Sequence, residues 1–123
     1  MSRRRGAVDS PVPGPSGLPM TSQGTAHGRF TRAVANGNLR GAELAARELG
    51  RLSLEDALRL CLLLADHDPA RFDRAALRWL ERFISERLPP LAEIALAASA
   101  FAELRHGDRR AGVASLERLA RRL

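Results

Sequence analysis

Residues 53–88 read SLEDALRLCLLLADHDPARFDRAALRWLERFISERL, and this stretch decides the fold class. Its first half predicts a helix over about 54–66 that is apolar on almost every side. An Asp68-Pro69 break follows, and the remainder predicts a second helix that ends near residue 87. A helix that is apolar all round has to be surrounded by other elements. The stretch therefore predicts an all-α, packed fold.

Similar start and stop signals divide the rest of the chain into further helices. Asn38 and Ser53 are good N-caps, and Gly50 is a good helix stop. Together the signals predict about six helices, at 27–35, 39–49, 54–66, 69–87, 90–105 and 109–122. Their connections are only a few residues long, and loops that short join antiparallel neighbours. We therefore expect three antiparallel hairpins, arranged as a compact bundle or a short α-solenoid-like stack.

The beginning of the chain differs in composition from the rest. It is rich in Pro, Gly and Ser, as in the run SPVPGPSGLP at residues 10–19. Such a segment cannot bury enough apolar surface to offset the entropy of ordering it. We expect a disordered tail over residues 1–25 and a single helical domain over residues 26–123.

A faint internal repeat agrees with stacked hairpins. Gly37-Asn38 stands ahead of one predicted helix, and Gly107-Asp108 stands ahead of another in the same way. This pattern resembles tetratricopeptide-type repeats, in which a turn of this kind precedes a helix. The chain lacks the Trp-Leu-Gly-Tyr signature of those repeats, and its hairpins are unequal in length. The resemblance therefore implies hairpin stacking, without membership of that family.

A second resemblance covers roughly residues 30–105. The segments that carry it are RLSLEDAL at 51–58, LLLA at 62–65, DPARF at 68–72 and AALRWL at 75–80. They resemble a group of small helical proteins common in high-GC Gram-positive bacteria. The resemblance implies a compact helical fold and supplies no activity.

The charge of the chain is high but unevenly placed. All twenty basic residues are arginine, and the net charge is +6. Residues 26–104 hold eleven arginines and eleven acidic residues, whereas residues 105–123 hold six arginines and two acidic residues. A protein that binds nucleic acid through its folded domain usually carries its excess of positive charge on that domain.

Apolar runs are far shorter than the roughly 20 residues of a membrane span, so we expect a cytoplasmic protein without a membrane span.

Side chains suited to catalysis or metal binding are sparse. Cys61, the single cysteine, lies in an apolar run, which favours a buried and unreactive thiol. His67 lies between two aspartates, but no Cys or second His stands at ligand spacing to complete a metal site. The sequence shows no Gly-rich phosphate loop and no nucleophile elbow. We expect a protein that is not an enzyme and that uses no cofactor or metal.

Arginines on the helix over 69–87 form the first candidate for partner binding. The apolar stripe of that helix contains Phe72, Ala76, Trp79, Leu80, Phe83 and Leu88. The opposite side carries Arg71, Arg74, Arg78 and Arg82, which span about 80° of arc at about 100° per residue. Such a row can meet an acidic partner or phosphates. The interpretation that we favour is a solvated face, in which Arg78 reaches Glu81 and Arg82 reaches Glu86.

The C-terminal helix is the second candidate, because it is basic and amphipathic. Its arginines are Arg109, Arg110, Arg118, Arg121 and Arg122. They either complement the helix dipole at the end of the bundle, which is the interpretation we favour, or contact an acidic partner or an anionic surface.

The turn at Asp66-His67-Asp68 permits a helix-turn-helix interpretation of the two helices that it joins. That turn lacks the usual Gly, and the start of the second helix offers no Asn, Gln or Lys for base edges. Antiparallel hairpin packing is the better prediction.

Taken together, these features of the sequence predict a small non-catalytic interaction or regulatory module with an unidentified protein partner. A DNA-associated accessory protein that uses the basic helix faces is the alternative.

Overall fold

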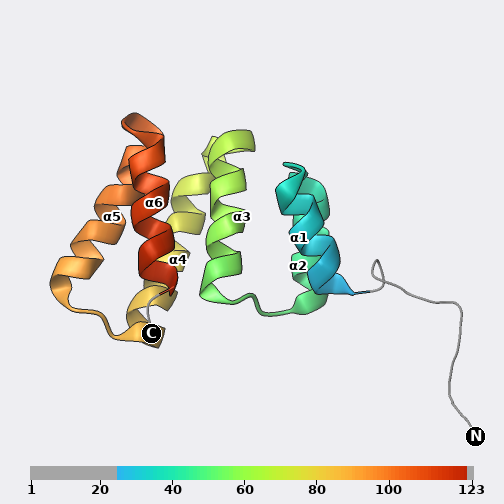
Figure 1. The fold of residues 1–123 in the computed structure, drawn as a ribbon, viewed down its shortest axis with the longest axis horizontal. Coiled ribbons are helices and arrows are strands. Elements are labelled where there is room, and N and C mark those ends of the chain that lie inside the picture. The colour runs from blue at the N-terminus through green and yellow to red at the C-terminus, as the bar shows by residue number, and fades with distance from the viewer. Residues whose placement is uncertain (1–24, 122–123) are drawn as a thin grey trace, which may run out of the picture. The chain divides into compact units, whose positions relative to one another are not determined.

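The computed structural model describes residues 25–121, and all of the regular structure in that range is helical (Figure 1). The helices are α1 (Ala26–Ala35), α2 (Leu39–Leu49), α3 (Leu54–His67), α4 (Pro69–Arg87), α5 (Leu91–His106) and α6 (Arg109–Arg121). The predicted all-α fold and its three hairpins are confirmed, because α1 packs on α2, α3 on α4 and α5 on α6. The tail expected over residues 1–25 lies, apart from Thr25, outside the described residues.

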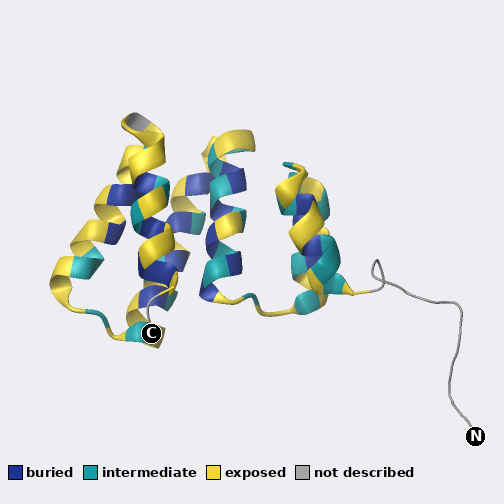
Figure 2. Ribbon diagram, viewed as in Figure 1, coloured by how far each residue is buried: buried dark blue, intermediate teal, exposed yellow. Residues whose placement is uncertain are grey.

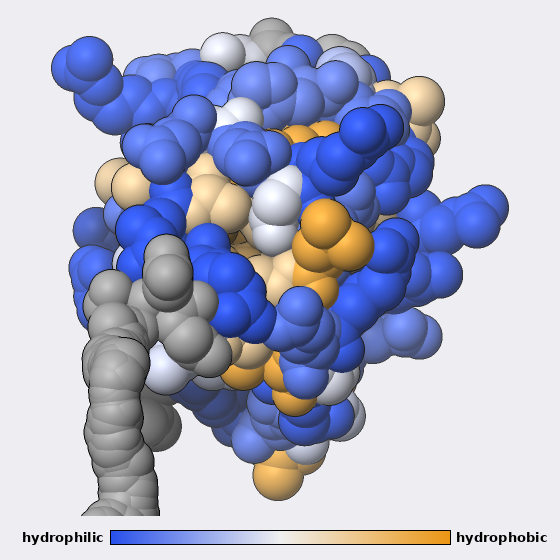
Figure 3. Space-filling view, turned by 90° about the vertical axis from the view of Figure 1, so that its right-hand side faces the viewer, coloured by the Kyte–Doolittle hydropathy of each residue, from blue (hydrophilic) through white to orange (hydrophobic). Residues whose placement is uncertain are grey.

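The described helices fall into two compact units, which divide after Arg51. We describe each unit by itself, and the expectation of one domain over residues 26–123 stays a prediction. The first unit is the α1–α2 hairpin. The face that Figure 3 shows is mostly hydrophilic, with hydrophobic side chains in small areas.

Local contacts explain why the first hairpin forms where it does. The Thr25 hydroxyl accepts a hydrogen bond from the Gly28 backbone N–H at 2.9 Å, and the Asn38 side chain accepts one from Gly41 at 3.0 Å. These contacts satisfy backbone donors that the first turn of each helix leaves free. Between the two helices, Arg29 forms an ion pair with Glu48.

The second unit, α3 to α6, is a ring of four helices. Its helices contact one another in the order α3, α4, α5, α6 and back to α3. In Figure 1, α6 lies in front, α4 behind, and α5 and α3 on either side. Helices α4 and α6 are therefore diagonal to each other, as are α3 and α5.

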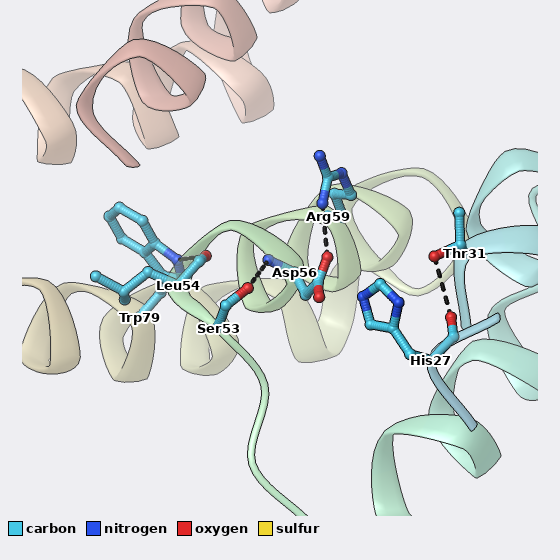
Figure 4. A network of polar contacts seen from close by, with 7 residues as sticks. All are labelled: His27, Thr31, Ser53, Leu54, Asp56, Arg59 and Trp79. Atoms are coloured by element: carbon cyan, nitrogen blue, oxygen red, sulfur yellow. Dashed lines mark hydrogen bonds and ion pairs between the residues drawn. The ribbon is translucent and has the colours of Figure 1, made fainter. Parts of the chain in front are cut away.

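An aromatic cluster fills the centre of this ring. Phe101 of α5 contacts Phe72 and Trp79 of α4 edge-on, with ring centroids 5.9 and 5.6 Å apart. Phe83 stacks on Trp79 at 5.2 Å. The indole N–H of Trp79 donates to the backbone carbonyl of Leu54 at 2.8 Å, which ties α4 to the first turn of α3 (Figure 4).

Helix α3 begins at the predicted cap. The Ser53 hydroxyl accepts from the Asp56 backbone N–H at 3.0 Å, and the Asp56 carboxylate in turn pairs with Arg59 at 2.6 Å (Figure 4). Asp68, at the N-cap position of α4, is different. Its side chain makes no capping hydrogen bond within α4, because its carboxylate pairs with Arg71 at 2.7 Å instead.

The apolar stripe predicted on α4 is correct except at its end. Phe72, Ala76, Trp79 and Phe83 are buried, and Leu80 is half-buried. Leu88, however, is 81% exposed. It caps the helix in a left-handed conformation, with φ 48°, ahead of Pro89. Since the residue before a proline avoids the right-handed helical region, Leu88 leaves the helix and its side chain leaves the core face.

Candidate interaction surfaces

The predicted arginine row lies on the exposed side of α4, but only part of it is available. Arg71 pairs with Asp68 at 2.7 Å, and Arg82 pairs with Glu86 at 2.7 Å as expected. Arg74 and Arg78 are exposed and have no ion-pair partner among residues 25–121. The expected contact from Arg78 to Glu81 is therefore not formed. The row reduces to two unpaired cations one helical turn apart.

The α6 arginines are similarly divided. Arg109 pairs with Asp66 at 2.9 Å and so ties α6 to the end of α3. Arg110, Arg118 and Arg121 are exposed, with no ion-pair partner in the described part of the chain. Arg122 lies outside the described residues. Glu117 lines the same shallow depression as Arg110, so this face of α6 is not uniformly positive.

The ring of helices separates the two sets of arginines. Helices α4 and α6 are diagonal to each other, and the unpaired arginines lie on the side of each helix away from its buried residues. The outward sides of two diagonal helices face in opposite directions. The α4 and α6 arginines therefore cannot contact one flat partner at the same time.

Helix α5 carries an apolar surface that sequence reasoning missed. One side of α5 holds the buried residues Ala97, Ala100 and Phe101, and the other side is exposed (Figure 2). We define the α5 face as its exposed residues before Glu103, none of which is charged. They are Leu91, Ala92, Ala95, Leu96, Ala98, Ser99 and Ala102. At about 100° per residue they cover about 160° of the helix surface.

The α5 face continues onto the neighbouring edge of α4. Arg105 of α5 pairs with Asp73 of α4 at 3.0 Å, which marks where the two helices meet at the surface. On the α4 side, Leu77 lies four residues after Asp73 and Ile84 lies seven residues after Leu77, so all three lie along the same edge of the helix. Leu77 and Ile84 are 64% and 39% exposed. Leu88, in the connection between the two helices, is also exposed.

A signal for this surface exists in the sequence. Between Leu91 and Ala102 the only charged residue is Glu93. An amphipathic surface helix normally has a polar side, and α5 has too few polar residues to supply one. The candidate surfaces predicted from the sequence were defined by rows of arginines, and α5 carries a single arginine, Arg105, at its C-terminal end.

The cysteine of the second unit lies in its core. The Cys61 thiol is buried and donates to the Ala75 carbonyl at 3.6 Å. Burial raises its pKa to about 12, so the nucleophilic thiolate is not formed near neutral pH. Within residues 25–121 no three His, Cys, Asp or Glu side chains group in a way that could hold a metal ion.

The contact pattern of α3 and α4 favours the hairpin over a helix-turn-helix. Leu54 meets Trp79 and Cys61 meets Ala75, so the two helices run in opposite directions along their shared length. In a helix-turn-helix the second helix crosses the first at a steep angle. No helix in the described part of the chain is long and apolar enough to cross a membrane.

No protein-family model, curated protein or solved structure matches this chain.

Proposed function

We propose that this protein is a small non-catalytic interaction module and that the α5 face is its binding surface. The observation that carries the proposal is the exposure of uncharged, largely apolar residues along α5, with Leu91 80% and Leu96 42% exposed. Contiguous apolar surface of this kind on a folded domain marks an interaction site far more often than scattered apolar residues do. A helix of a partner can pack its own apolar side against this surface, as in recognition of amphipathic helices in general.

Photo-crosslinking in the source cell tests this proposal. A photoreactive amino acid replaces Ala95, in the middle of the α5 face, and in a separate variant replaces Ala114, which is exposed on the outer side of α6. We expect adducts with a polypeptide from position 95 and none from position 114. Adducts from position 114 alone, or from neither position, would contradict the proposal.

A DNA-associated role is the second candidate, because unpaired arginines are available. Arg74 and Arg78 of α4, and Arg110, Arg118 and Arg121 of α6, are exposed without ion-pair partners among residues 25–121. Because α4 and α6 are diagonal to each other, only one of the two sets of arginines can contact a DNA duplex at a time. That leaves two or three phosphate contacts. Each contact adds roughly one unit to the salt dependence of binding.

Titration of duplex DNA at several salt concentrations separates the two candidates. We expect only weak binding with a shallow salt slope, unchanged by R74A/R78A. Submicromolar affinity with a steep slope, lost in R74A/R78A or in R110A/R118A/R121A, would favour the DNA-associated role and would show which face carries it.

A further inference from the structure

We infer that the occupant of the α5 face is a second copy of this chain, with the two α5 helices packed antiparallel about a two-fold axis. This inference rests on the proposed function, since it takes the α5 face to be the binding surface. Like a C2 interface in general, it brings the same patch of both copies together.

The area of the patch is sufficient for a dimer. The large exposed apolar residues of α4 and α5 are Leu77, Ile84, Leu88, Leu91 and Leu96. Their exposed fractions together amount to about three fully exposed residues of leucine size. With the exposed alanines of the α5 face, the surface is on the order of 700 Å² per copy, close to the roughly 800 Å² that each partner contributes to a standard interface.

The charge distribution favours this face for self-association. The chain carries a net charge of +6, so two copies repel one another wherever their arginines approach. Arg110, Arg118 and Arg121 lie on the outer side of α6, whereas the α5 face holds no charged side chain. Contact through α5 is therefore the arrangement that buries apolar surface while it keeps these cations in solvent.

The middle of the face permits a close approach. Ala95 and Ser99 lie one helical turn apart at its centre, between Leu91 at one end and Ala102 at the other. Small side chains let two helix backbones approach to the short end of the usual 8–10 Å spacing. A two-fold axis between Ala95 and Ser99 places Ala95 of one copy opposite Ser99 of the other. It also places Leu91 of each copy opposite Ala102 and Glu103 at the far end of the other, where the Glu103 carboxylate accepts a hydrogen bond from the Asp108 backbone N–H.

Light scattering coupled to size exclusion, on the full chain, measures the mass directly. The mass of one copy is 13.4 kDa. We expect the measured mass to rise toward twice that value as the protein concentration increases from about 1 µM to about 1 mM. A constant mass of one copy over this range would overturn the inference, and so would a mass that grows beyond two copies.

A pair of substitutions tests whether α5 is the contact. Ala95→Glu buries an unpaired carboxylate in the proposed interface, so we expect the dissociation constant to rise at least about 100-fold. Ala114→Glu makes the same change on the exposed side of α6 and should leave dimerisation unchanged. Circular dichroism should show both variants folded, because both positions are exposed in the single chain. Dimerisation of A95E like that of the original chain would overturn the inference.

Complementation tests the antiparallel arrangement. Ser99→Arg alone should also prevent self-association, because it buries a guanidinium opposite Ala95. A mixture of A95E and S99R should form a heterodimer, because the introduced carboxylate of one chain then faces the introduced guanidinium of the other. Two monomers in the mixture would overturn the antiparallel packing.

The crosslinking experiment above separates this inference from the proposed function. Adducts at position 95 with another polypeptide, together with a monomer in solution, would leave the interaction module standing and overturn the second copy as its occupant. Adducts between position 95 and residues 1–24 of the same molecule would overturn both, because the chain itself would then cover the α5 face. The absence of any adduct at position 95 would overturn both.

Discussion

Helices α3 and α5 are both unusually apolar, yet they use their apolar surface differently. In α3, the residues Leu54, Leu58, Cys61 and Leu64 are all buried, and α4 and α6 both contact the helix. In α5, Ala97, Ala100 and Phe101 are buried, but Leu91 on the opposite side is 80% exposed. An apolar helix can thus be buried by other helices of its own chain, or can keep one side exposed where another molecule can bind. The experiments below test that difference in order of expected effect.

Introducing a carboxylate in each helix gives the largest contrast. Leu58 is 2% exposed, so Leu58→Asp places a charge where neither water nor a partner can compensate it. We expect a loss of more than about 4 kcal/mol in the free energy of unfolding. Leu91→Asp should change it by less than about 0.5 kcal/mol in a dilute monomer. Urea unfolding followed by circular dichroism measures both, and equal losses would contradict the comparison.

Leu62, in the same apolar run of α3, tests how far the buried side of this helix extends. Leu62 is half-buried, and its neighbours on that side, Arg59 and Asp66, are exposed. Leu62→Asp should therefore cost clearly less than Leu58→Asp. Helix α3 is apolar over most of its circumference, but it has a solvent side.

The anchor between α3 and α4 is the next test. The Trp79 indole N–H donates to the Leu54 carbonyl at 2.8 Å, inside the core. Trp79→Phe removes the hydrogen bond between the two helices and creates a small cavity, so we expect a loss of about 2 kcal/mol. Leu77→Ala, on the exposed edge of the same helix, should cost less than about 1 kcal/mol. A smaller loss in W79F than in L77A would show that this side of α4 is not the anchored one.

The buried side of α5 depends on a close approach to α6. A Cβ on Gly112 would lie 2.6 Å from the backbone carbonyl of Ala100, so Gly112→Ala should push the two helices apart. We expect a net loss of about 2 kcal/mol, although the same change stabilises an open helix by about 1 kcal/mol. Thermal unfolding of G112A, with Ala114→Gly as the control for helix propensity, measures this. A stabilised G112A would show that α5 and α6 pack more loosely.

Much of the fold follows from local signals in the sequence. Caps such as Asn38 and Ser53, and the stop at Gly50, act within a few residues of themselves. The predicted helix ends therefore lie within one residue of those observed. What the sequence did not predict depends on neighbours in space. The order of the helices in the ring determines whether an apolar helix is covered on one side, like α5, or on most of its circumference, like α3. The same order separates the two sets of arginines.

The site was predictable to a smaller extent. The exposure of Arg74 and Arg78 follows from the helical spacing of the α4 stripe. The pairing of Arg109 with Asp66, however, joins residues 43 positions apart, which no local pattern reveals. The exposed end of the stripe at Leu88 arises from one left-handed residue, whereas helical periodicity assumes that the helix continues.

The smallest effect concerns the thiol inside α3. Burial raises the pKa of Cys61 from 9.0 to about 12, so folding favours the protonated thiol. Its contribution to stability is complete below about pH 9 and is lost as the pH rises toward 12. The chain contains no Tyr and no Lys, so Cys61 is the only side chain expected to titrate between pH 8 and pH 11.

We expect the free energy of unfolding to fall by about 1 kcal/mol between pH 8 and pH 10. Cys61→Ala should remove this dependence, and a chain as stable at pH 10 as at pH 8 would show that water reaches the thiol in α3.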